Sequence, residues 1–107
     1  KSLVLQPMQD TILLRQFLYQ SGFVITYDKL IQDRNKYYSV IVAKISKKSQ
    51  ILPERNLFVG ITDWLNPGKD CIEFLRKEII RINNKKFKSE QDAKKLKYYN
   101  DLLKKEV

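Results

Sequence analysis

The residues of this sequence that could carry out chemistry are mostly cationic, and many of them lie in its last third. The 107 residues include 21 lysines and arginines against 12 aspartates and glutamates, which gives a net charge of +9. Such an excess favours a polyanionic partner, because ammonium and guanidinium groups neutralise phosphates. The candidate phosphate-binding residues are Arg76, Lys77, Arg81, Lys85, Lys86, Lys88, Lys94, Lys95 and Lys97.

Two interpretations of this basic set stay open. Glu73 precedes Lys77 by four residues, which is the spacing of an ion pair on a solvated helix face. By contrast, no acid closely precedes the Lys-Lys-Phe-Lys segment at 85–88, which favours contact with phosphates. The set therefore indicates either an RNA-binding surface or the solvated side of a helical hairpin.

Other reactive groups are few. The sequence has no histidine, which excludes His-based triads, His metal ligands and His acid–base catalysis from this chain. Cys71 is the single cysteine, so a cytoplasmic protein without a disulfide is expected, and without a basic partner this thiol should be inert. No run approaches the roughly 18 apolar residues of a membrane span, so we expect no membrane partner. Without histidine we expect no metal either.

The order of the apolar segments predicts an α/β chain that begins with a strand, a loop and a helix. Leu3-Val4-Leu5 is typical of a buried strand, because apolar residues fill both faces, and Pro7 ends it. A helix is expected over 11–21, with Asp10 as its N-cap and its end at Gly22.

Two further strands are expected at 23–31 and 37–45. The polar turn between them is short, so they should pair antiparallel. In the first of these strands, alternation places Phe23, Ile25 and Tyr27 on one face. The second strand is apolar on both faces near its middle, which predicts an interior strand.

The segment 66–107 predicts a basic helical hairpin. Asp70 can cap a helix that runs to about Asn83, and residues 89–92 resemble a capping box for a second helix. The link between the helices is short, so they should run antiparallel. The two predicted seams consist of Ile72, Leu75, Ile79 and Ile82 in the first helix and Ala93, Leu96, Asn100 and Leu103 in the second.

Three aromatic side chains and one arginine outside the basic set could also contact a ligand. Tyr37 and Tyr38 could stack on a base, although neighbours on a strand more often place one ring in the core and the other at its rim. Trp64 is expected to pack the helical hairpin onto the sheet, and Arg15 to solvate the outer face of its helix rather than bind phosphate.

Several motifs of the first half together resemble a known family. They look like the C-terminal part of the bacterial tRNA adenine-N1-methyltransferases of the TrmK type, densely over 3–45 and only in architecture beyond. The motifs are Leu3-Val4-Leu5-Gln6-Pro7-Met8, Leu14-Arg15-x-Phe17-Leu18, Gly22-Phe23-x-Ile25 and Tyr38-x-Val40-Ile41-Val42-Ala43.

The resemblance implies a fold and an activity. Residues 1–65 would be the C-terminal part of a Rossmann-like methyltransferase domain, with 3–6 as its fifth strand and an antiparallel hairpin closing the sheet. Residues 66–107 would form a coiled-coil-like helical hairpin. The parent enzyme would transfer a methyl group from S-adenosylmethionine to N1 of an adenine in tRNA.

The same resemblance locates the expected sites. Gln6, Pro7 and Met8 follow a parallel strand at the sheet edge that faces the ligand crevice, so they would form a wall of the substrate pocket. The family's glycine-rich loop and its ribose-binding acid are absent from this sequence, so the cofactor should bind outside this chain. No catalytic residue can be named.

Two alternatives remain from the residues alone. The chain could be a stand-alone basic RNA-binding module without catalytic activity. It could also be an oligomerisation module, in which the seam of 72–82 pairs between chains; otherwise a monomer is expected.

Overall fold

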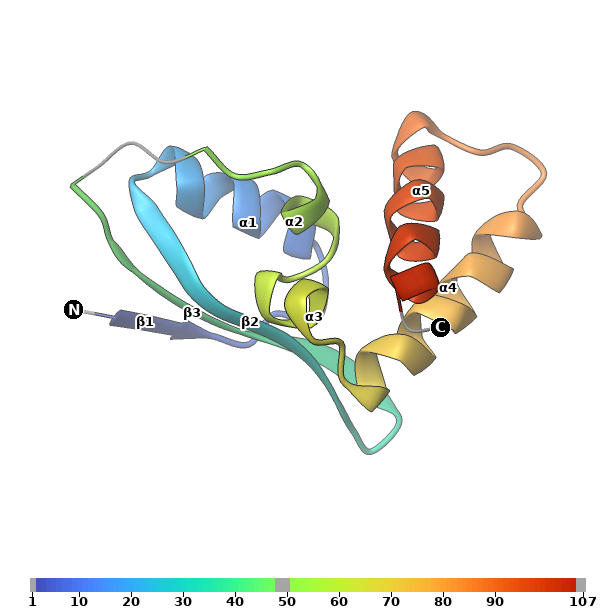
Figure 1. The fold of residues 1–107 in the computed structure, drawn as a ribbon, viewed down its shortest axis with the longest axis horizontal. Helices are drawn as coiled ribbons and strands as arrows, with labels where there is room; N and C mark the ends of the chain where they lie inside the picture. Colours follow the sequence, from blue (N-terminus) through green and yellow to red (C-terminus); the bar gives the residue numbers. More distant parts are fainter. Residues whose placement is uncertain (1, 48–50, 106–107) are drawn as a thin grey trace.

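A three-stranded sheet and five helices make up the described residues, 2–47 and 51–105, of the computed structural model (Figure 1). In chain order the elements are β1 (Ser2–Leu5), α1 (Thr11–Gln20), β2 (Phe23–Asp33), β3 (Lys36–Ile45), α2 (Arg55–Phe58), α3 (Ile61–Leu65), α4 (Lys69–Asn83) and α5 (Glu90–Lys105).

Strand β3 lies in the centre of the sheet, in the order β1-β3-β2, and pairs antiparallel with both neighbours. The prediction that this strand is interior is therefore confirmed, and β1 and β2 run parallel to each other. Arg34 and Asn35 join β2 to β3 with positive φ angles of 53° and 68°. Two such residues are typical of the tight turn that matches the right-handed twist of paired strands.

Strand β1 is an exposed edge, so the prediction of a buried strand is wrong for this chain. Leu3 and Val4 keep 43% and 63% of their surface exposed. Within the described residues β1 has only β3 as a neighbour, and its other edge has no strand beside it. Its apolar composition is that of a strand covered on both sides, but among the described residues of β1 only Leu5 is half-buried and packs against the core.

A β-bulge in β2 overturns the predicted alternation of that strand. The register with β3 shifts between Ile25 and Tyr27, so Thr26 is an extra residue without a partner in the ladder. Beyond the bulge the two faces exchange roles, because side chains alternate with a period of two. Tyr27 is therefore 37% exposed, and Asp28 points into the interior instead.

Helix α1 covers one face of the sheet. Leu18 packs with Ile25, Ile41 and Ala43 in a buried apolar cluster. The helix begins after Asp10, as expected, but Asp10 adopts a left-handed conformation and its side chain makes no capping hydrogen bond. Asp10 is therefore the N-cap residue, as predicted, but only its backbone carbonyl oxygen, which accepts from the Leu14 N–H at 3.0 Å, contributes to the cap.

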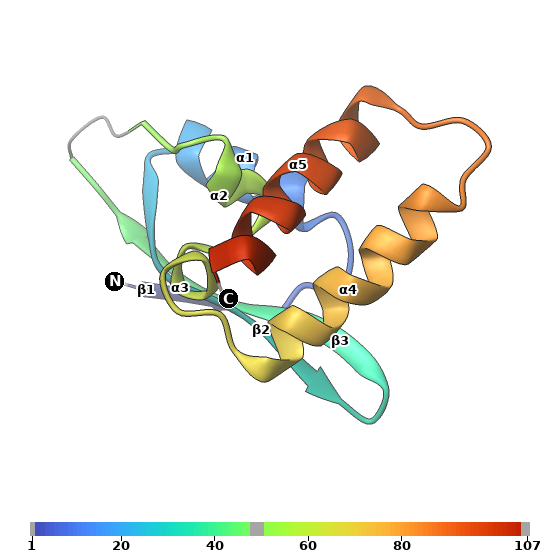
Figure 2. The same cartoon turned by 45° about the vertical axis from the view of Figure 1, so that its right-hand side comes forward.

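Helices α4 and α5 run in opposite directions and form a helical arm beside the sheet (Figure 2). Leu75 and Ile82 of α4 are buried, and the other two members of the predicted α4 seam are half-buried. The predicted α5 seam is wrong, because its members Ala93 and Asn100 are exposed. The buried face of α5 consists of Asp92, Tyr99 and Leu102.

The rotation of α5 about its own axis is set by its contact with a second helix. Helix α5 packs against α2 as well as α4, and Tyr98 stacks on Phe58 with ring centroids 5.5 Å apart. A seam between two helices alone would place Asn100 inward. Because α5 also contacts α2, it is rotated from that orientation. Its apolar residues face a core shared by α2, α4 and α5, which includes Val59 and Cys71.

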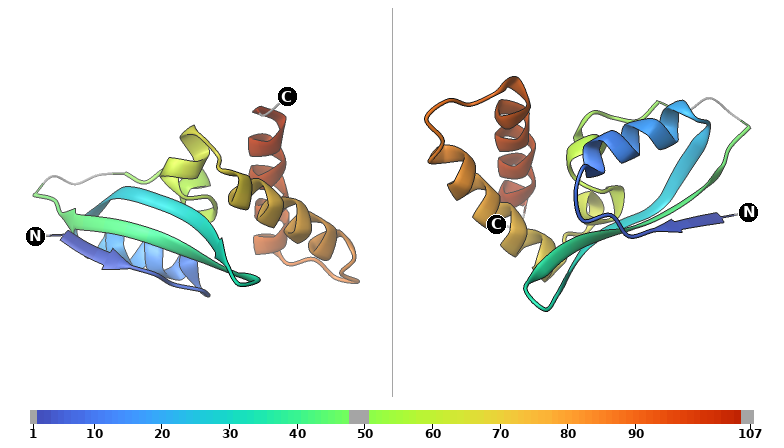
Figure 3. Two further views of the ribbon diagram at one scale, coloured as in Figure 1. Left: turned by 90° about the horizontal axis from the view of Figure 1, so that it is seen from below. Right: turned by 180° about the vertical axis from the view of Figure 1, so that it is seen from behind.

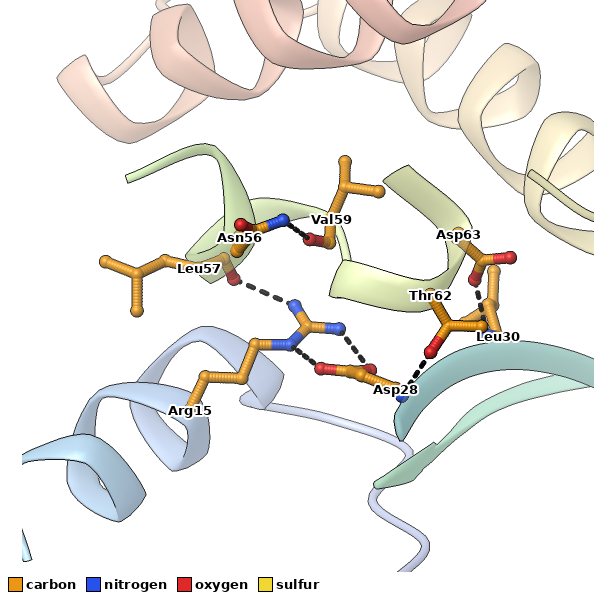
Figure 4. Close-up of polar contacts among 8 residues, drawn as sticks. All are labelled: Arg15, Asp28, Leu30, Asn56, Leu57, Val59, Thr62 and Asp63. Carbon is orange, nitrogen blue, oxygen red and sulfur yellow. Dashed lines mark hydrogen bonds and ion pairs between the residues drawn. The ribbon is translucent and has the colours of Figure 1, made fainter. Parts of the chain in front are cut away.

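A buried ion pair joins α1 to β2 beneath α2 and α3 (Figure 4). The Arg15 guanidinium donates to both carboxylate oxygens of Asp28, at 2.7 Å and 3.1 Å, and to the Leu57 carbonyl oxygen at 2.8 Å. Arg15 is 4% exposed and Asp28 is 1% exposed. Arg15 therefore neither solvates its helix nor faces a phosphate, and the expectation for it was wrong.

Gly60 allows α3 to approach this ion pair closely. A Cβ atom at this position would collide with the backbone oxygen and the carboxylate of Asp28. Any side chain here would force α3 away from β2, so only glycine fits at this crossing.

Side chains from α3 and α4 cover the free edge of β2. Three successive outward N–H groups of the strand donate to oxygen atoms of these helices rather than to another strand. Asp70 is one of the acceptors and does not cap α4, whose N-cap is Gly68. The pairs are Asp28 N to Thr62 Oγ1 at 2.9 Å, Leu30 N to Asp63 Oδ2 at 2.7 Å and Gln32 N to Asp70 Oδ2 at 3.0 Å.

The ion pair gives a test of the fold. We expect Arg15→Met to destabilise the protein by roughly 3–5 kcal/mol, because it leaves the Asp28 carboxylate buried without its partner. Adding Asp28→Leu should recover most of that loss. Urea denaturation measures both, with Gln16→Met, an exposed position of the same helix, as the control. A loss below about 1 kcal/mol for Arg15→Met would show that the pair does not hold these elements together.

Candidate functional site

A pocket of about 530 Å³ lies between the sheet and the helical arm. It is lined by the segment 7–13, the start of β3 and residues of α2, α4 and α5. Because the segment that follows β1 lines it, the pocket lies at the carboxyl end of β1, where ligands bind in open α/β sheets. Its volume is in the range of sites for small molecules and nucleosides.

Two of the three residues predicted to form a pocket wall line the pocket. Pro7 and Met8 line the pocket, whereas Gln6 does not. The Pro7 carbonyl oxygen accepts a hydrogen bond of 3.0 Å from the Ser39 N–H, which fixes this segment against β3. Met8 is 55% exposed and lies at the pocket surface.

Tyr37 connects the sheet to α4 and is not available for base stacking. Its hydroxyl donates to Glu73 Oε1 at 2.5 Å and accepts from Lys77 at 3.2 Å, and its ring contacts Phe74 edge-on at 5.2 Å. The bond to Glu73 raises the pKa of Tyr37. The expected packing role holds for this residue, and Tyr38 lies half-buried in the pocket wall.

Two buried groups near the pocket are structural. Asp63 accepts N–H groups from Leu30 and Gly68, and its burial raises the pKa of its carboxyl group. Cys71 is 2% exposed, and desolvation raises the pKa of its thiol far above the ordinary value. The thiol is therefore held as a neutral core group, which agrees with the prediction that it is inert.

Trp64 joins the end of the arm to α3, as expected from the sequence. The Lys105 ammonium group lies 4.8 Å from the centre of the indole ring and donates to the Trp64 carbonyl oxygen at 3.1 Å. Trp64 also packs against the core that α4 and α5 share with α2.

About half of the predicted phosphate-binding set is engaged within the protein. Lys77 pairs with Glu73, Arg81 with Glu78, Lys94 with Glu54 and Lys85 with Asp92. Lys95 lines the pocket, and Lys97 lies over the Tyr98 ring. Among the described residues, the members of the set that are exposed and make no ion pair or ring contact are Arg76, Lys86 and Lys88.

The loop at the tip of the arm is held by Asp92. Ser89 N–H donates to Asp92 Oδ2 and Asp92 N–H donates to Ser89 Oγ, both at 3.0 Å, so the predicted capping box is confirmed. Lys85 Nζ lies 2.7 Å from the same carboxylate. These contacts, with Lys85 first, lower the pKa of Asp92 to about 2. Lys85 therefore stabilises the loop, and Lys86 and Lys88 project from it.

Two kinds of site are absent from the residues that the structure describes. They contain no cluster of three or more acidic or cysteine side chains that could hold a metal ion. No helix among residues 2–47 and 51–105 has the length and apolar character needed to cross a membrane.

Comparison with known proteins connects this chain to one family. The model of the TrmK family, tRNA (adenine(22)-N(1))-methyltransferase, matches residues 1–106. A putative tRNA methyltransferase of Mycoplasma pneumoniae is 30% identical over 105 residues, which are 97% of this chain and 38% of that protein.

Solved structures share the fold. A putative tRNA (m1A22) methyltransferase of Streptococcus pneumoniae, in complex with S-adenosyl-L-methionine, matches with a TM-score of 0.84 and 18% identity over 96% of this chain and 47% of its own. A protein of the NADB-Rossmann superfamily from Streptococcus agalactiae matches with a TM-score of 0.79 and 23% identity, over 96% of this chain and 48% of its own. The chain thus spans about half the length of these structures.

The capping box at the tip of the arm gives a pH-dependent prediction. We expect Asp92→Asn to lower the melting temperature at neutral pH, because the amide cannot pair with Lys85 as the carboxylate does. The folded pKa of about 2 lies below the ordinary value, so the stabilisation is present above about pH 4 and is lost as the pH falls through about 2. The difference in melting temperature should therefore shrink over that range. Asp101→Asn, at an exposed position of α5, is the control, and a difference that does not change with pH would contradict the assignment.

Proposed function

The chain belongs to the family of tRNA (adenine(22)-N(1))-methyltransferases, and we propose that it forms the part of such an enzyme that completes the methyltransferase sheet and binds the tRNA. The observation that carries this proposal is the family match over residues 1–106, together with coverage of only about half of each related structure. In this proposal the protein transfers a methyl group to N1 of an adenine in tRNA, and the chain is the C-terminal part of that enzyme.

The methyl donor in this proposal is S-adenosylmethionine, which is bound in the related Streptococcus pneumoniae structure. The described residues offer no glycine-rich turn between a strand and a helix that could hold such a cofactor. Gly60 lies against Asp28 and Gly68 against the Lys29 side chain, so neither leaves space for a nucleotide. We therefore assign no step of the reaction to a cofactor site in these residues.

The open edge of β1 supports the role in completing a sheet. Leu3 and Val4 are apolar and exposed, and the outer edge of β1 has no partner strand among the described residues. The opposite edge, on β2, is covered by Thr62, Asp63 and Asp70. In this proposal a strand of the cofactor-binding part is therefore added beside β1.

The pocket at the carboxyl end of β1 is the place we propose for the target base. Pro7 and Met8 would form one wall of it, as the sequence predicts, and Tyr38 lies beside them. N1 of neutral adenine is a weak nucleophile, so holding the base in the correct orientation would be a large part of catalysis. Gln6 lies outside this wall, and its proposed role is limited to the end of β1.

The exposed cations of the arm would bind the tRNA backbone. Arg76, Lys86 and Lys88 face solvent and can neutralise phosphates without breaking an internal ion pair. Phosphate contacts give affinity and position but little sequence information. Lys77, Arg81, Lys85 and Lys94 would contribute less, because each already pairs with an acid.

The oligomerisation alternative has less support. Leu75 and Ile82 of the α4 seam are buried within this chain and are not available to a second copy. A monomer is the simpler proposal, and a tRNA substrate agrees with the expected cytoplasmic location.

The role of the arm is tested by removing its two free lysines. We expect Lys86→Gln with Lys88→Gln to weaken tRNA binding and to reduce the slope of log affinity against log salt by roughly two units or slightly less. Measuring tRNA affinity at several salt concentrations checks this. The matched control is Lys44→Gln with Lys47→Gln, two exposed lysines at the carboxyl end of β3. Figure 1 shows that this end of β3 lies away from the arm. Equal effects of the two pairs would mean that only net charge matters, and the arm would not be the binding surface.

The role of the pocket is tested by filling it. Met8→Trp should lower the methylation rate by roughly tenfold to a hundredfold, because a misplaced base loses the gain from orientation. Since Met8 is exposed, the melting temperature should not change, and tRNA affinity should remain close to that of the wild type. Gln16→Trp on the outer face of α1 is the control. Methylation at the wild-type rate in the filled variant would exclude the pocket as the site of the base.

A further inference from the structure

The tip of the arm presents an aromatic side chain to solvent. Phe87 is 86% exposed, more than any other aromatic residue that the structure describes. It lies in the loop between α4 and α5, which is at the end of the arm remote from α1 (Figure 3). A large apolar ring in this position contributes nothing to the two buried clusters of the fold.

The loop that carries Phe87 is fixed from both sides. On one side Lys85 pairs with Asp92 at 2.7 Å, and on the other Ser89 and Asp92 exchange two hydrogen bonds of 3.0 Å. The ring is therefore attached to an ordered loop rather than to a free end. Because this loop is already ordered in the unbound protein, little conformational entropy is lost on binding.

The neighbours of Phe87 determine which ligand suits it. Lys86 and Lys88 are exposed and make no ion pair among the described residues. A flat apolar ring between two ammonium groups matches a ligand in which flat bases alternate with phosphates. Every unpaired base offers a face on which an aromatic side chain can stack.

We propose that Phe87 stacks on an unpaired base of the tRNA while Lys86 and Lys88 contact the phosphates on either side of it. This inference rests on the proposed binding of tRNA by the arm and adds to it a contact that needs a single-stranded nucleotide. The tip would then distinguish unpaired from paired regions of the RNA, which lysines alone do not do.

An anionic membrane surface is the other ligand that a ring between lysines could meet. Stable membrane binding by a peripheral segment needs a larger apolar face, or a lipid anchor together with a basic patch. The loop between α4 and α5 offers one apolar side chain, since its other residues are asparagine, lysine and serine. The composition of the tip therefore favours RNA.

The experiment compares four variants of the full-length protein for binding to tRNA and to a fully paired RNA duplex. We expect Phe87→Ala and Phe87→Leu to weaken tRNA binding by roughly fivefold to a hundredfold, with no change in salt slope and little change for the duplex. Phe87→Trp should retain affinity, since it keeps an aromatic face. Ile80→Ala removes an exposed apolar side chain from the same arm and should have no effect.

The inference would be overturned if Phe87→Ala bound tRNA with wild-type affinity, or if Phe87→Leu did so. It would also be overturned if Phe87→Ala weakened binding to the duplex as much as binding to tRNA. So would loss of binding to phosphatidylserine vesicles in Phe87→Ala with tRNA affinity unchanged, which would assign the tip to membranes. If Lys86→Gln with Lys88→Gln leaves tRNA binding unchanged, the proposed binding of tRNA by the arm fails. If that pair weakens binding and Phe87→Ala does not, only the stacking contact fails.

Discussion

The buried carboxylate of Asp28 is the group on which the arrangement of the other elements depends. It points into the interior because the extra residue at Thr26 shifts the side chains that follow in β2 to the opposite faces of the sheet. Arg15 on α1 neutralises the carboxylate, with Nε 2.7 Å from Oδ2. Gly60 allows α3 to lie directly against it. An unpaired charge at this depth would cost several kcal/mol, so α1, β2 and α3 must keep their positions together.

That constraint also sets where the arm lies. Helix α3 is followed after three residues by α4, and Asp63 and Asp70 both accept N–H groups of β2. The arm is thus fixed to the part of β2 whose Leu30 also lines the pocket. In our account this gives a fixed separation between the pocket for the target base and the cations at the tip, so that one RNA can contact both.

The sequence predicted the elements better than the contacts between them. Periodicity and turn residues located the three strands and α1, α4 and α5, and the Ser89–Asp92 box was correct, because these features depend on local chain geometry. The short helices α2 and α3 were not predicted, because each is too short to show a helical period. The bulge, the Arg15–Asp28 pair and the rotation of α5 depend on partners far apart in the sequence. The sequence predicted that basic residues gather on the arm. Their spacing could not show that Lys85 pairs with Asp92, whereas Lys86 and Lys88 make no ion pair among the described residues.

The most direct test of this account is hydrogen–deuterium exchange of the full-length protein with and without tRNA. It follows the tip of the arm and the pocket in one experiment, without any substitution. We expect slower exchange in residues 84–89 and in 6–13 when tRNA is bound, with little change near 44–47 at the carboxyl end of β3. Unchanged exchange in 84–89, with protection limited to the sheet, would show that the arm does not hold the tRNA.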